Sequence, residues 1–562
     1  MDIFRENFHE TFDSLKSKIE TCKFWSFDLE MSGINTSDKS QQNRRDDSVD
    51  VRYKKMVSVA TKFSIIQFGL CLFHDDGQGG LLASPYNFYL FPNDSPQDIV
   101  LSASAIKFLR DHNMDFQKWI GKGVTFVDAL GEQIVKDRLF GESKPRYPVT
   151  LSAKSDIEFM ERNMQAMSDF MDNDAEEIFT FEGCNGFLRR CIYEQVEAKY
   201  PNQVIVKKAD WNSLSAFKVS QTALEEKDRQ DKEKKEKDYF DALGFRHVFN
   251  ALVESRKPLV GHNLFADLLF TLRWFDAPLP DTYQAFRQHL HQLFPCIYDT
   301  KYIDGCGAIG VVQTDTSLQQ CFQRYCESLH PAEDKSADAT RVPVAVGEDL
   351  QQYVDLSGGN FHAAGYDAYC TGYVFAQQMA LCEATGTALE SCANKIFMMW
   401  SVFDMDLDPI RNVNGFTCKY PGTMVRLTGF PKKFDTQKVL DLCSAAGFST
   451  EEDKEKLKVI WVDDYSLFVS LPCEWNDIRI SQILTQLNEE AFGMGGVQLL
   501  NEFLVKGPAG PPVSQEREVA HGGDEAGPGK REGPVSMWRS AVNMLLGPFR
   551  WAAFGDTDDV VR

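Results

Sequence analysis

The chain has 562 residues, of which 43% are hydrophobic and 25% are charged, and its formal net charge is −22. A chain of this length and composition folds as roughly three or four globular domains. The acidic balance excludes a general affinity for nucleic acid, so any contact with RNA or DNA depends on a local basic groove or a bound metal ion.

The cysteines and apolar segments favour a protein of the cytoplasm, the nucleus or both. The 14 cysteines include no Cys-x-x-Cys pair, which is typical of reduced, buried thiols. The first residues lack the apolar core of a secretory signal. Because no run of about 18 apolar residues occurs, we expect no membrane span.

The first 150 residues alternate between helical and strand-like patterns. Residues 4–22 have helical spacing, and residues 23–34 alternate as a short strand. Residues 35–54 are polar and of mixed charge, which predicts a loop or a partly disordered insertion. Strands at residues 63–73 and 88–91 follow. Three consecutive strands with short links predict an antiparallel meander.

Residues 151–244 combine helices with a strand in an acidic setting. The pattern predicts helices at residues 155–172 and 184–200 and a strand at residues 204–208. A dense run of mixed charge at residues 224–238 predicts a solvated helix or a linker.

Residues 245–402 return to the alternation of strands and helices that is typical of an α/β protein. Residues 258–260 predict a short buried strand that enters a strongly apolar helix through Gly261-His262-Asn263. Residues 296–303 predict another strand, and residues 369–381 predict a long helix.

Residues 403–506 show a third pattern. The predicted elements are a strand at 424–428, a helix at 436–446, strands at 459–462 and 466–471, a helix at 478–488 and a strand at 497–500. This βαββαβ order is that of an RNA-recognition motif (RRM). In the tail, residues 507–536 predict disorder. The aromatic residues 537–554 fit a docking segment, a membrane-surface segment or a terminal helix packed on the body.

Two acidic residues stand side by side on the first predicted strand. Asp28 and Glu30 share one face of this strand, because successive side chains of a strand point to opposite sides. A divalent cation would offset their repulsion, and Mg²⁺ prefers oxygen ligands. An isolated pair of this kind more often faces water, so its interpretation depends on the rest of the chain.

Three further residues match this pair. Asp267 is flanked by apolar residues on a predicted helix. If it is buried, it needs a partner group or a metal ion, because burying an isolated carboxylate is costly. The alternative is that it lies on the solvent-exposed side of the helix. His362 and Asp367 are separated by four residues at the start of a helix, where both can reach one point. A neutral histidine beside metal-bound carboxylates is suited to accept a proton from water.

The order of these residues along the chain is specific. Four carboxylates can hold two Mg²⁺ ions about 4 Å apart, which activate water and stabilise the leaving oxygen of a phosphodiester. The order resembles the DEDDh class of 3′→5′ exonucleases. That resemblance implies an RNase H-like fold, in which three antiparallel strands are followed by parallel ones.

A closer resemblance is to the poly(A)-specific ribonuclease (PARN) family. It is carried by residues 27–34 (FDLEMSGI), 68–71 (FGLC), 87–92 (NFYLFP), 260–263 (VGHN) and 364–369 (AGYDAY), and it covers roughly residues 1–150 and 245–400. The resemblance implies that the four carboxylates bind two Mg²⁺ ions, with Mn²⁺ as a substitute, and that His362 is the general base. It also implies a homodimer that acts on single-stranded RNA with a 3′ poly(A) tail.

The same resemblance implies substrate contacts at Met31, Ser32, Ile34, Asn263 and Lys301. The family often has an aromatic residue at the position of Met31, so the packing of a base near the scissile end differs here. For Lys301, a surface lysine after a strand is the alternative interpretation.

The segment at residues 151–244 resembles the Arg-xxx-His single-strand-binding domain of the family. This chain departs from the motif, because Tyr193 stands four residues after Arg189 in place of histidine. Arg189 and Arg190 fit contacts with phosphate, whereas Tyr193 equally fits a core position.

The predicted RRM lacks the usual Lys/Arg-Gly-Phe start of its RNA-binding strand. Trp461 and the acids after it instead resemble the family segment that stacks the 7-methylguanosine cap. An indole face attracts the positive charge of a methylated guanine. A tryptophan buried in the core of a small sheet is the alternative.

We therefore expect an α/β protein with an RNase H-like exonuclease domain at residues 1–150 and 245–402. A small α+β insert at 151–244 interrupts it, and an RRM-like domain at 403–506 and a tail at 507–562 follow. The expected function is Mg²⁺-dependent shortening of poly(A) tails with release of 5′-AMP and stimulation by the cap.

Two alternatives remain. One is a 3′ trimming exonuclease of small non-coding RNAs, and the other is a catalytically inactive RNA- or cap-binding scaffold. Family members that trim small RNAs tend to carry a C-terminal membrane helix, for which residues 537–554 are too short. The presence of all four acidic residues of the expected metal site argues against a catalytically inactive scaffold.

Overall fold

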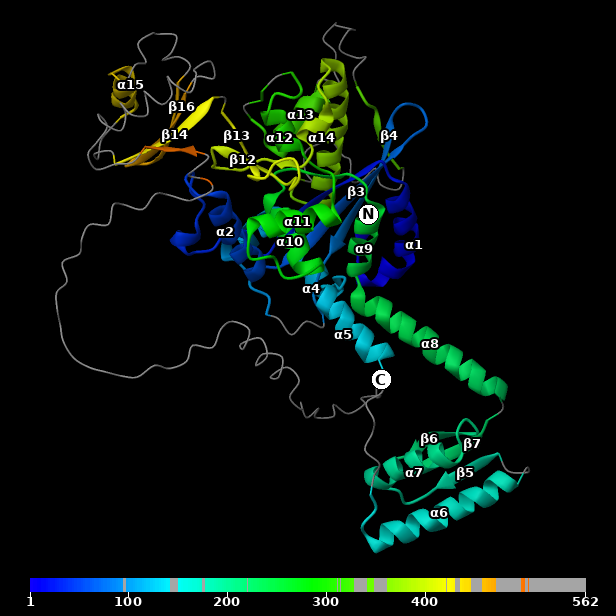
Figure 1. The fold of residues 1–562 in the computed structure, drawn as a ribbon. Helices are drawn as coiled ribbons and strands as arrows, with labels where there is room; N and C mark the ends of the chain where they lie inside the picture. Colours follow the sequence, from blue (N-terminus) through cyan, green and yellow to red (C-terminus); the bar gives the residue numbers. More distant parts are fainter. Residues whose placement is uncertain are drawn as a thin grey trace, which may run out of the picture. The chain divides into compact units, whose positions relative to one another are not determined.

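The computed structural model (Figure 1) describes residues 1–93, 98–141, 150–173, 177–219, 221–310, 312–313, 315–327, 341–347, 361–420, 422–429, 435–445, 457–471, 497–500 and 504. The helix predicted at residues 478–488 and the whole tail from residue 507 lie outside the described residues.

One mixed sheet organises the nuclease part of the chain. Its strands are β1 (Asp2–Ile3), β2 (Phe24–Met31), β3 (Ile65–Asp75), β4 (Leu81–Tyr89), β8 (Leu259–Gly261), β9 (Ile297–Asp299) and β10 (Val344–Val346). They run in the order β1-β4-β3-β2-β8-β9, and β10 also pairs with β4. β2, β3 and β4 are antiparallel, whereas β8 and β9 run parallel to β2. The predicted antiparallel meander is confirmed.

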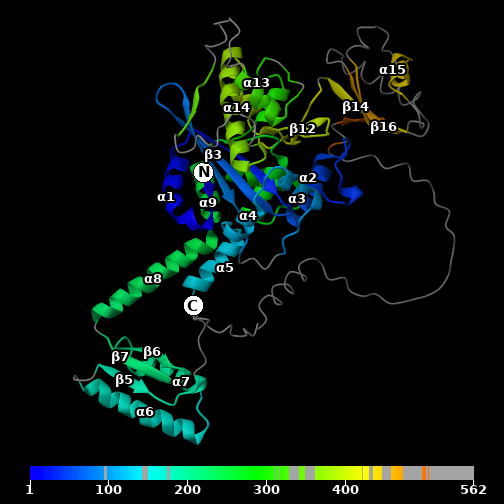
Figure 2. The ribbon, with the colours of Figure 1, turned by 180° about the vertical axis from the view of Figure 1, so that it is seen from behind.

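Helices cover both faces of this sheet (Figures 1 and 2). The helices of the nuclease part are α1 (Arg5–Thr21), α2 (Val49–Lys62), α3 (Ala103–Asp111), α4 (Phe116–Lys122), α5 (Ala129–Phe140), α9 (Arg246–Ser255), α10 (Phe265–Phe275), α11 (Tyr283–Leu293), α12 (Thr300–Gly305), α13 (Leu318–Glu327) and α14 (Ala364–Thr385), with short 3₁₀ turns η1 (Lys39–Gln41) and η4 (Leu389–Cys392). Phe27 and Leu29 pack into the larger core with α1, α9 and α10. Phe24 and Phe73 pack on the other face with α14.

Several boundaries differ from the sequence predictions. The strand predicted at residues 88–91 is β4, which spans Leu81–Tyr89, and the helix predicted at residues 369–381 is α14, which spans Ala364–Thr385. Residues 35–54 are not all loop, because α2 begins at Val49 after the hydroxyl of Ser48 caps the amide of Val51. The strand predicted at residues 296–303 ends at Asp299, whose side chain caps α12. The apolar helix after β8 begins at Phe265 rather than at His262, because Asn263 adopts a left-handed backbone conformation.

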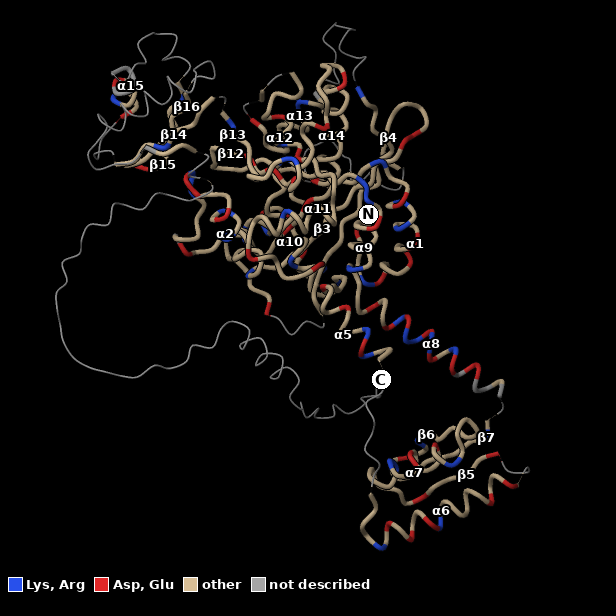
Figure 3. The backbone as a smooth tube through the Cα atoms, in the orientation of Figure 1, with Lys and Arg blue, Asp and Glu red and all other residues tan. Residues whose placement is uncertain are grey.

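The segment at residues 151–244 has its own sheet and core. It contains α6 (Lys154–Asp172), β5 (Ile178–Phe181), α7 (Gly186–Lys199), β6 (Val204–Asp210) and β7 (Ser213–Lys218), with the antiparallel order β5-β7-β6. β5 and β7 were not predicted. Met167, Phe181 and Ile192 are central to its core. The mixed-charge run forms α8 (Gln221–Leu243), along which acidic and basic residues alternate (Figure 3).

After α14, two small sheets follow. The first contains β11 (Lys395–Ile396), β12 (Phe403–Asp406) and β13 (Phe416–Cys418), and the second contains β14 (Thr423–Thr428), β15 (Lys458–Asp463), β16 (Ser466–Leu471) and β17 (Val497–Leu499), with α15 (Thr436–Ala445) between β14 and β15. The second sheet has the antiparallel order β15-β16-β14-β17. Among the described helices, none has the length and apolar character needed to cross a membrane.

Candidate active site

The strand β2 presents Asp28 and Glu30 on the face of the sheet that α14 covers. Their neighbours Phe27 and Leu29 are buried in the opposite core, which fixes the alternation of the strand. A β-bulge follows Glu30, because Glu30 pairs with Gln67 whereas Met31 pairs with Ile65. Bulges of this kind change the direction of a strand beside functional sites.

The helix α14 crosses β2 and β3 at very short range. Gly69 lies opposite Asp28 in the β2–β3 ladder, and a β-carbon on Gly69 would overlap the carbonyl group of Ala364. The hydroxyl of Ser26 donates to the carbonyl oxygen of Ala368 at 2.6 Å. These contacts fix the first turn of α14, which carries Asp367, against the acidic face of β2.

The helix α10 brings Asp267 to the same place. The backbone of Leu29 and the carboxylate of Asp28, both on β2, influence the pKa of Asp267, which places the start of α10 against β2. The bend before α10 is held by Asp299, a fully buried residue at the end of β9. Its carboxylate accepts hydrogen bonds from four backbone N–H groups, those of Asn263, Leu264, Lys301 and Phe397. Asp299 was not singled out from the sequence.

The four predicted carboxylates therefore meet at one point. Burial raises the pKa of Asp28 to about 7. Burial, followed by the charges of Asp28, Asp367 and Asp267, raises the pKa of Glu30 well above its ordinary value. The pKa values of Asp267 and Asp367 are likewise raised by burial and then by the charge of Asp28. Within the described residues, no lysine or arginine contributes to these shifts.

The arrangement of the carboxylates fits a cation. Ligand atoms of Glu30, His362 and Asp367 all lie within 4.8 Å of one another. One carboxylate oxygen of Asp367, Oδ1, is buried without a hydrogen-bond partner. Because an uncompensated buried carboxylate is costly, and because hard divalent ions prefer oxygen ligands, this donor set is suited to Mg²⁺ or Mn²⁺.

His362 lies at the edge of the carboxylates, where the chain turns into α14. Its backbone is left-handed, with φ of +72°, and its N–H donates to Oδ2 of Asp367 at 3.0 Å. Its ring lies edge-on to His112 and Phe108, with centroid distances of 4.1 and 4.8 Å. Burial and then the charge of His112 lower the pKa of His362, so the ring is neutral at pH 7 and can accept a proton.

His112 and Phe108 were also missed by sequence reasoning. Both belong to the end of α3, about 250 residues before His362 in the chain. No local pattern could have joined them to it.

The predicted substrate contacts divide into two groups. Ile34 is 52% exposed at the end of β2, and Asn263 lies in the bend before α10, where its side-chain amide donates to Sδ of Met399 at 3.5 Å. In contrast, Met31 is buried in the core. Ser32 is fully buried. Its hydroxyl donates to the carbonyl oxygen of Val100 and accepts from the backbone N–H of Ser64. The side chains of Met31 and Ser32 are thus turned into the protein, and their contacts with substrate stay predictions.

Lys301 also contacts neighbouring residues of the protein. Its Nζ donates to the carbonyl oxygen of Thr316 at 2.8 Å and lies 5.3 Å from the centre of the Phe397 ring. Burial lowers its pKa. The side chain of Lys301 thus packs within the protein, and its contact with an RNA backbone stays a prediction.

The other predicted nucleic-acid contacts lie outside the nuclease sheet. Arg189, Arg190 and Lys208 line a cavity of about 330 Å³ on the insert. Tyr193 lines the same cavity and is 38% exposed, so a core position for it is wrong. Trp461 lies on β15, is half-buried and donates its indole N–H to the hydroxyl of Thr436 at 3.0 Å.

This chain is similar in sequence to several known ribonucleases. The model of the CAF1 family ribonucleases matches residues 3–375. The poly(A)-specific ribonuclease PARN of Xenopus laevis is 28% identical over 84% of this chain and 77% of its own length. The pre-piRNA 3′-exonuclease trimmer of Bombyx mori is 28% identical over 69% of this chain and 73% of its own length. A structure of S. pombe Pop2p in its Mg²⁺- and Mn²⁺-bound form covers 70% of this chain and 98% of its own, at 14% identity and a TM-score of 0.35.

The family model spans more than half of the chain, and the resemblance to poly(A)-specific ribonucleases is confirmed over most of its length. The chain is therefore an enzyme and belongs to the CAF1 family of ribonucleases.

Proposed function

We propose that this enzyme is a Mg²⁺-dependent 3′→5′ exoribonuclease that shortens poly(A) tails and releases 5′-AMP. The observation that carries the proposal is the convergence of Asp28, Glu30, Asp267 and Asp367, without any compensating basic residue among those described, beside a neutral histidine. The preference for poly(A) is supported by the relatives named poly(A)-specific ribonucleases.

The four carboxylates would hold two Mg²⁺ ions, with Mn²⁺ as a substitute. When bound, the ions supply positive charge that favours ionisation of an attacking water and offsets charge on the phosphodiester oxygens. Burial is the main cause of the raised pKa values of the carboxylates, and for Glu30 the negative charges of Asp28, Asp367 and Asp267, which a cation would neutralise, raise the pKa further.

His362 would act as the general base in this reaction. Its ring is neutral at pH 7, because burial and the charge of His112 lower its pKa, and it therefore accepts the proton of the attacking water. The N–H of His362 also orients Oδ2 of Asp367. Base and metal ligand are thus fixed by one short segment, and the edge-on rings of His112 and Phe108 restrict rotation of the imidazole.

At the entrance to the site, Ile34 and Asn263 would contact the terminal nucleotides. Ile34 offers an exposed apolar side chain directly after the catalytic strand. Further away, the cavity lined by Arg189, Arg190 and Lys208 would bind phosphates of single-stranded RNA. The antiparallel order β15-β16-β14-β17 supports an RRM-like fold for residues 403–506.

A cap site on β15 is a second part of the proposal. Trp461 is followed by Asp463 and Asp464, and an indole beside acids favours a positively charged methylated guanine. The test compares binding of a 7-methylguanosine cap analogue by the wild type and by Trp461→Ala, with an unmethylated analogue as control. Equal affinities of the two proteins would remove Trp461 from a cap site.

The main experiment incubates the wild type and Asp28→Ala with Mg²⁺ and 5′-labelled RNAs that end in A, U or C tracts. Asp13→Ala is the matched control, because Asp13 is an exposed acid on α1. We expect the wild type and the control to shorten the A tract fastest and to release 5′-AMP, and Asp28→Ala to be inactive. If the wild type leaves all three RNAs intact, the proposed activity is wrong.

A second candidate function is 3′ trimming of small RNAs, which the similarity to the Bombyx mori trimmer favours. Equal rates on A and U tracts would support this candidate and would remove the poly(A) preference. We further propose a homodimer in the cytoplasm, the nucleus or both, and sedimentation of the purified protein tests the dimer.

A further inference from the structure

Trp400 is an exposed aromatic residue on the loop between β11 and β12. Its side chain is 64% exposed, and its backbone is left-handed with φ of +52°. A bulky residue in this region is strained, and strain of this kind persists only where the surrounding structure holds it, which is most common at functional sites. An exposed apolar residue alone needs no explanation, but an exposed and strained one does.

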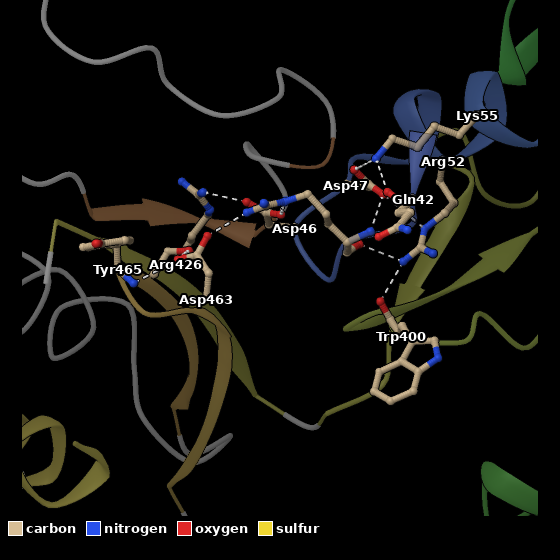
Figure 4. Close-up of polar contacts among 11 residues, drawn as sticks. Gln42, Asp46, Asp47, Arg52, Lys55, Trp400, Arg426, Asp463 and Tyr465 are labelled. Carbon is tan, nitrogen blue, oxygen red and sulfur yellow. Dashed lines mark hydrogen bonds and ion pairs between the residues drawn. The ribbon is translucent and has the colours of Figure 1, made fainter. Parts of the chain in front are cut away.

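The strained conformation is held by Arg52 on α2. Arg52 is buried, and its Nη2 donates to the carbonyl oxygens of Trp400 at 2.6 Å and of Arg44 at 2.8 Å. Asp47 lies beside the guanidinium, with an N–O distance of 3.8 Å. Figure 4 shows the indole of Trp400 directed away from Arg52. The buried anchor therefore fixes the backbone and leaves the indole largely exposed.

The guanidinium of Arg45 lies over one face of the exposed ring. The guanidinium carbon of Arg45 is 5.7 Å from the centre of the Trp400 indole, and its Nη1 donates to the carbonyl oxygen of Trp461 at 3.0 Å.

The neighbouring arginines are paired differently. Arg44 binds Asp46 and Asp463, and Arg426 also binds Asp46 (Figure 4). Among the described residues, Arg45 forms no ion pair with a carboxylate. Its charge is therefore available to an anion beside the indole.

The loop that carries Trp400 is joined by hydrogen bonds to the bend before α10, the helix that carries Asp267. The residue before it, Met399, accepts a hydrogen bond from Asn263, four residues before Asp267. The N–H of Phe397 donates to the same Asp299 carboxylate that holds the bend at Asn263. Asp299 thus holds both the loop that carries Trp400 and the bend that precedes the helix of Asp267.

We propose that Trp400 and Arg45 form a binding subsite for an upstream nucleotide of single-stranded RNA. The base stacks on the exposed indole, and the adjoining phosphate pairs with the guanidinium of Arg45. Stacking on an aromatic ring accepts every base, so the subsite holds the RNA strand without selecting its sequence. The inference rests on the proposed function and adds to it a site that retains the substrate between rounds of cleavage.

The test measures binding and kinetics of the full chain with a 15-nucleotide oligo(A). The variants are Trp400→Ala and Trp400→Phe, and Ile410→Ala is the control because Ile410 is an apolar side chain that is 79% exposed on the same region. We expect Trp400→Ala to weaken equilibrium binding in EDTA by about 5- to 100-fold, the range of one stacked base. Trp400→Phe should retain most of the affinity, and Ile410→Ala all of it.

Abasic substitutions identify the stacked nucleotide. At one upstream position, loss of the base should weaken binding to the wild type but not further weaken binding to Trp400→Ala, which is the coupling that a double-mutant cycle detects. In the kinetics, KM should rise for Trp400→Ala while kcat stays within about twofold, because stacking upstream binds ground and transition states alike.

Equal affinity of the wild type and Trp400→Ala, or no coupling at any abasic position, would overturn the subsite. A rise in KM that Ile410→Ala reproduces would also overturn it. The binding measurement in EDTA does not depend on catalysis, so a wild type that cleaves no RNA would refute the proposed function without deciding the fate of the subsite.

Discussion

Gly69 and Ala364 are in direct van der Waals contact where β3 passes beneath the first turn of α14, at the position in the sheet that lies opposite Asp28. A β-carbon at Gly69 would overlap the carbonyl oxygen and carbon of Ala364. The same turn carries Asp367, whose Oδ2 accepts from the N–H of His362. The distance between the acids of β2 and Asp367 on α14 thus depends on the absence of a side chain at Gly69.

Substitution Gly69→Ala should therefore abolish most of the activity while leaving the protein folded. The added methyl group pushes the first turn of α14 away from β2, and displacement of a catalytic group by about 1 Å costs on the order of 100-fold in rate. The measurement is kcat on oligo(A), together with circular dichroism. Gly121→Ala is the control, because an added β-carbon there meets no atom within 4 Å. Wild-type activity in Gly69→Ala would contradict this account.

Mg²⁺ should stabilise the protein against heat. A ligand that binds only the folded state raises the free energy of unfolding by mass action, and the negative charges of Asp28, Glu30, Asp267 and Asp367 lack compensation by basic residues among those described. Differential scanning fluorimetry with Mg²⁺ and with EDTA should show a Tm several degrees higher with the ion. The variant Asp367→Asn should lose most of this difference, whereas Asp13→Ala should keep it. A wild-type Tm that is insensitive to Mg²⁺ would count against the metal site.

Asp299→Asn should damage both stability and activity. The buried carboxylate accepts from four backbone N–H groups, and an amide would turn its own donors towards some of them. Leaving buried donors unpaired costs about 1–3 kcal/mol each, so we expect a clear decrease in the urea midpoint. The control is Asp315→Asn, where an exposed acid accepts from the N–H of Ser317. An unchanged midpoint and rate in Asp299→Asn would show that the bend before α10 does not need this residue.

His289 should contribute stability that depends on pH. Its Nε2 lies 2.5 Å from Oδ2 of Asp276, and that hydrogen bond raises the pKa of His289. Because the folded-state pKa lies above the unfolded value of 6.5, the contribution is complete below pH 6.5 and is lost as pH rises through the folded pKa.

The loss of urea stability on His289→Gln should accordingly be larger at pH 6 than at pH 8.5. The difference should be at most about 1 kcal/mol, since the imidazole is 35% exposed. Gln165→Ala, which removes an exposed side chain without a titratable group, should show no such change with pH. A loss that grows towards pH 8.5 would reverse the sign of the argument.

The sequence alone determined the identity and order of the catalytic candidates. Asp28 and Glu30 could be assigned to one face because strand alternation is local, and Asp267, His362 and Asp367 followed on predicted elements that the structure contains. The meander of β2, β3 and β4 was equally accessible, since its links are short. The assignment of the strands depends on contacts between residues that are near in the chain, whereas the grouping of the five residues rests on the resemblance to the DEDDh exonucleases.

Only the tertiary structure decided how the site is held and approached. Ser32 was predicted to contact substrate, but its hydroxyl forms buried hydrogen bonds with Val100 and Ser64. Nζ of Lys301 donates to the carbonyl oxygen of Thr316. Contacts between residues far apart in the chain suggested roles for three residues that the sequence did not single out. These contacts are Asp299 with Phe397, His112 with His362, and Trp400 with Arg52. The physical reason is that burial and hydrogen-bond partners are set by packing between distant segments, which periodicity and composition do not encode.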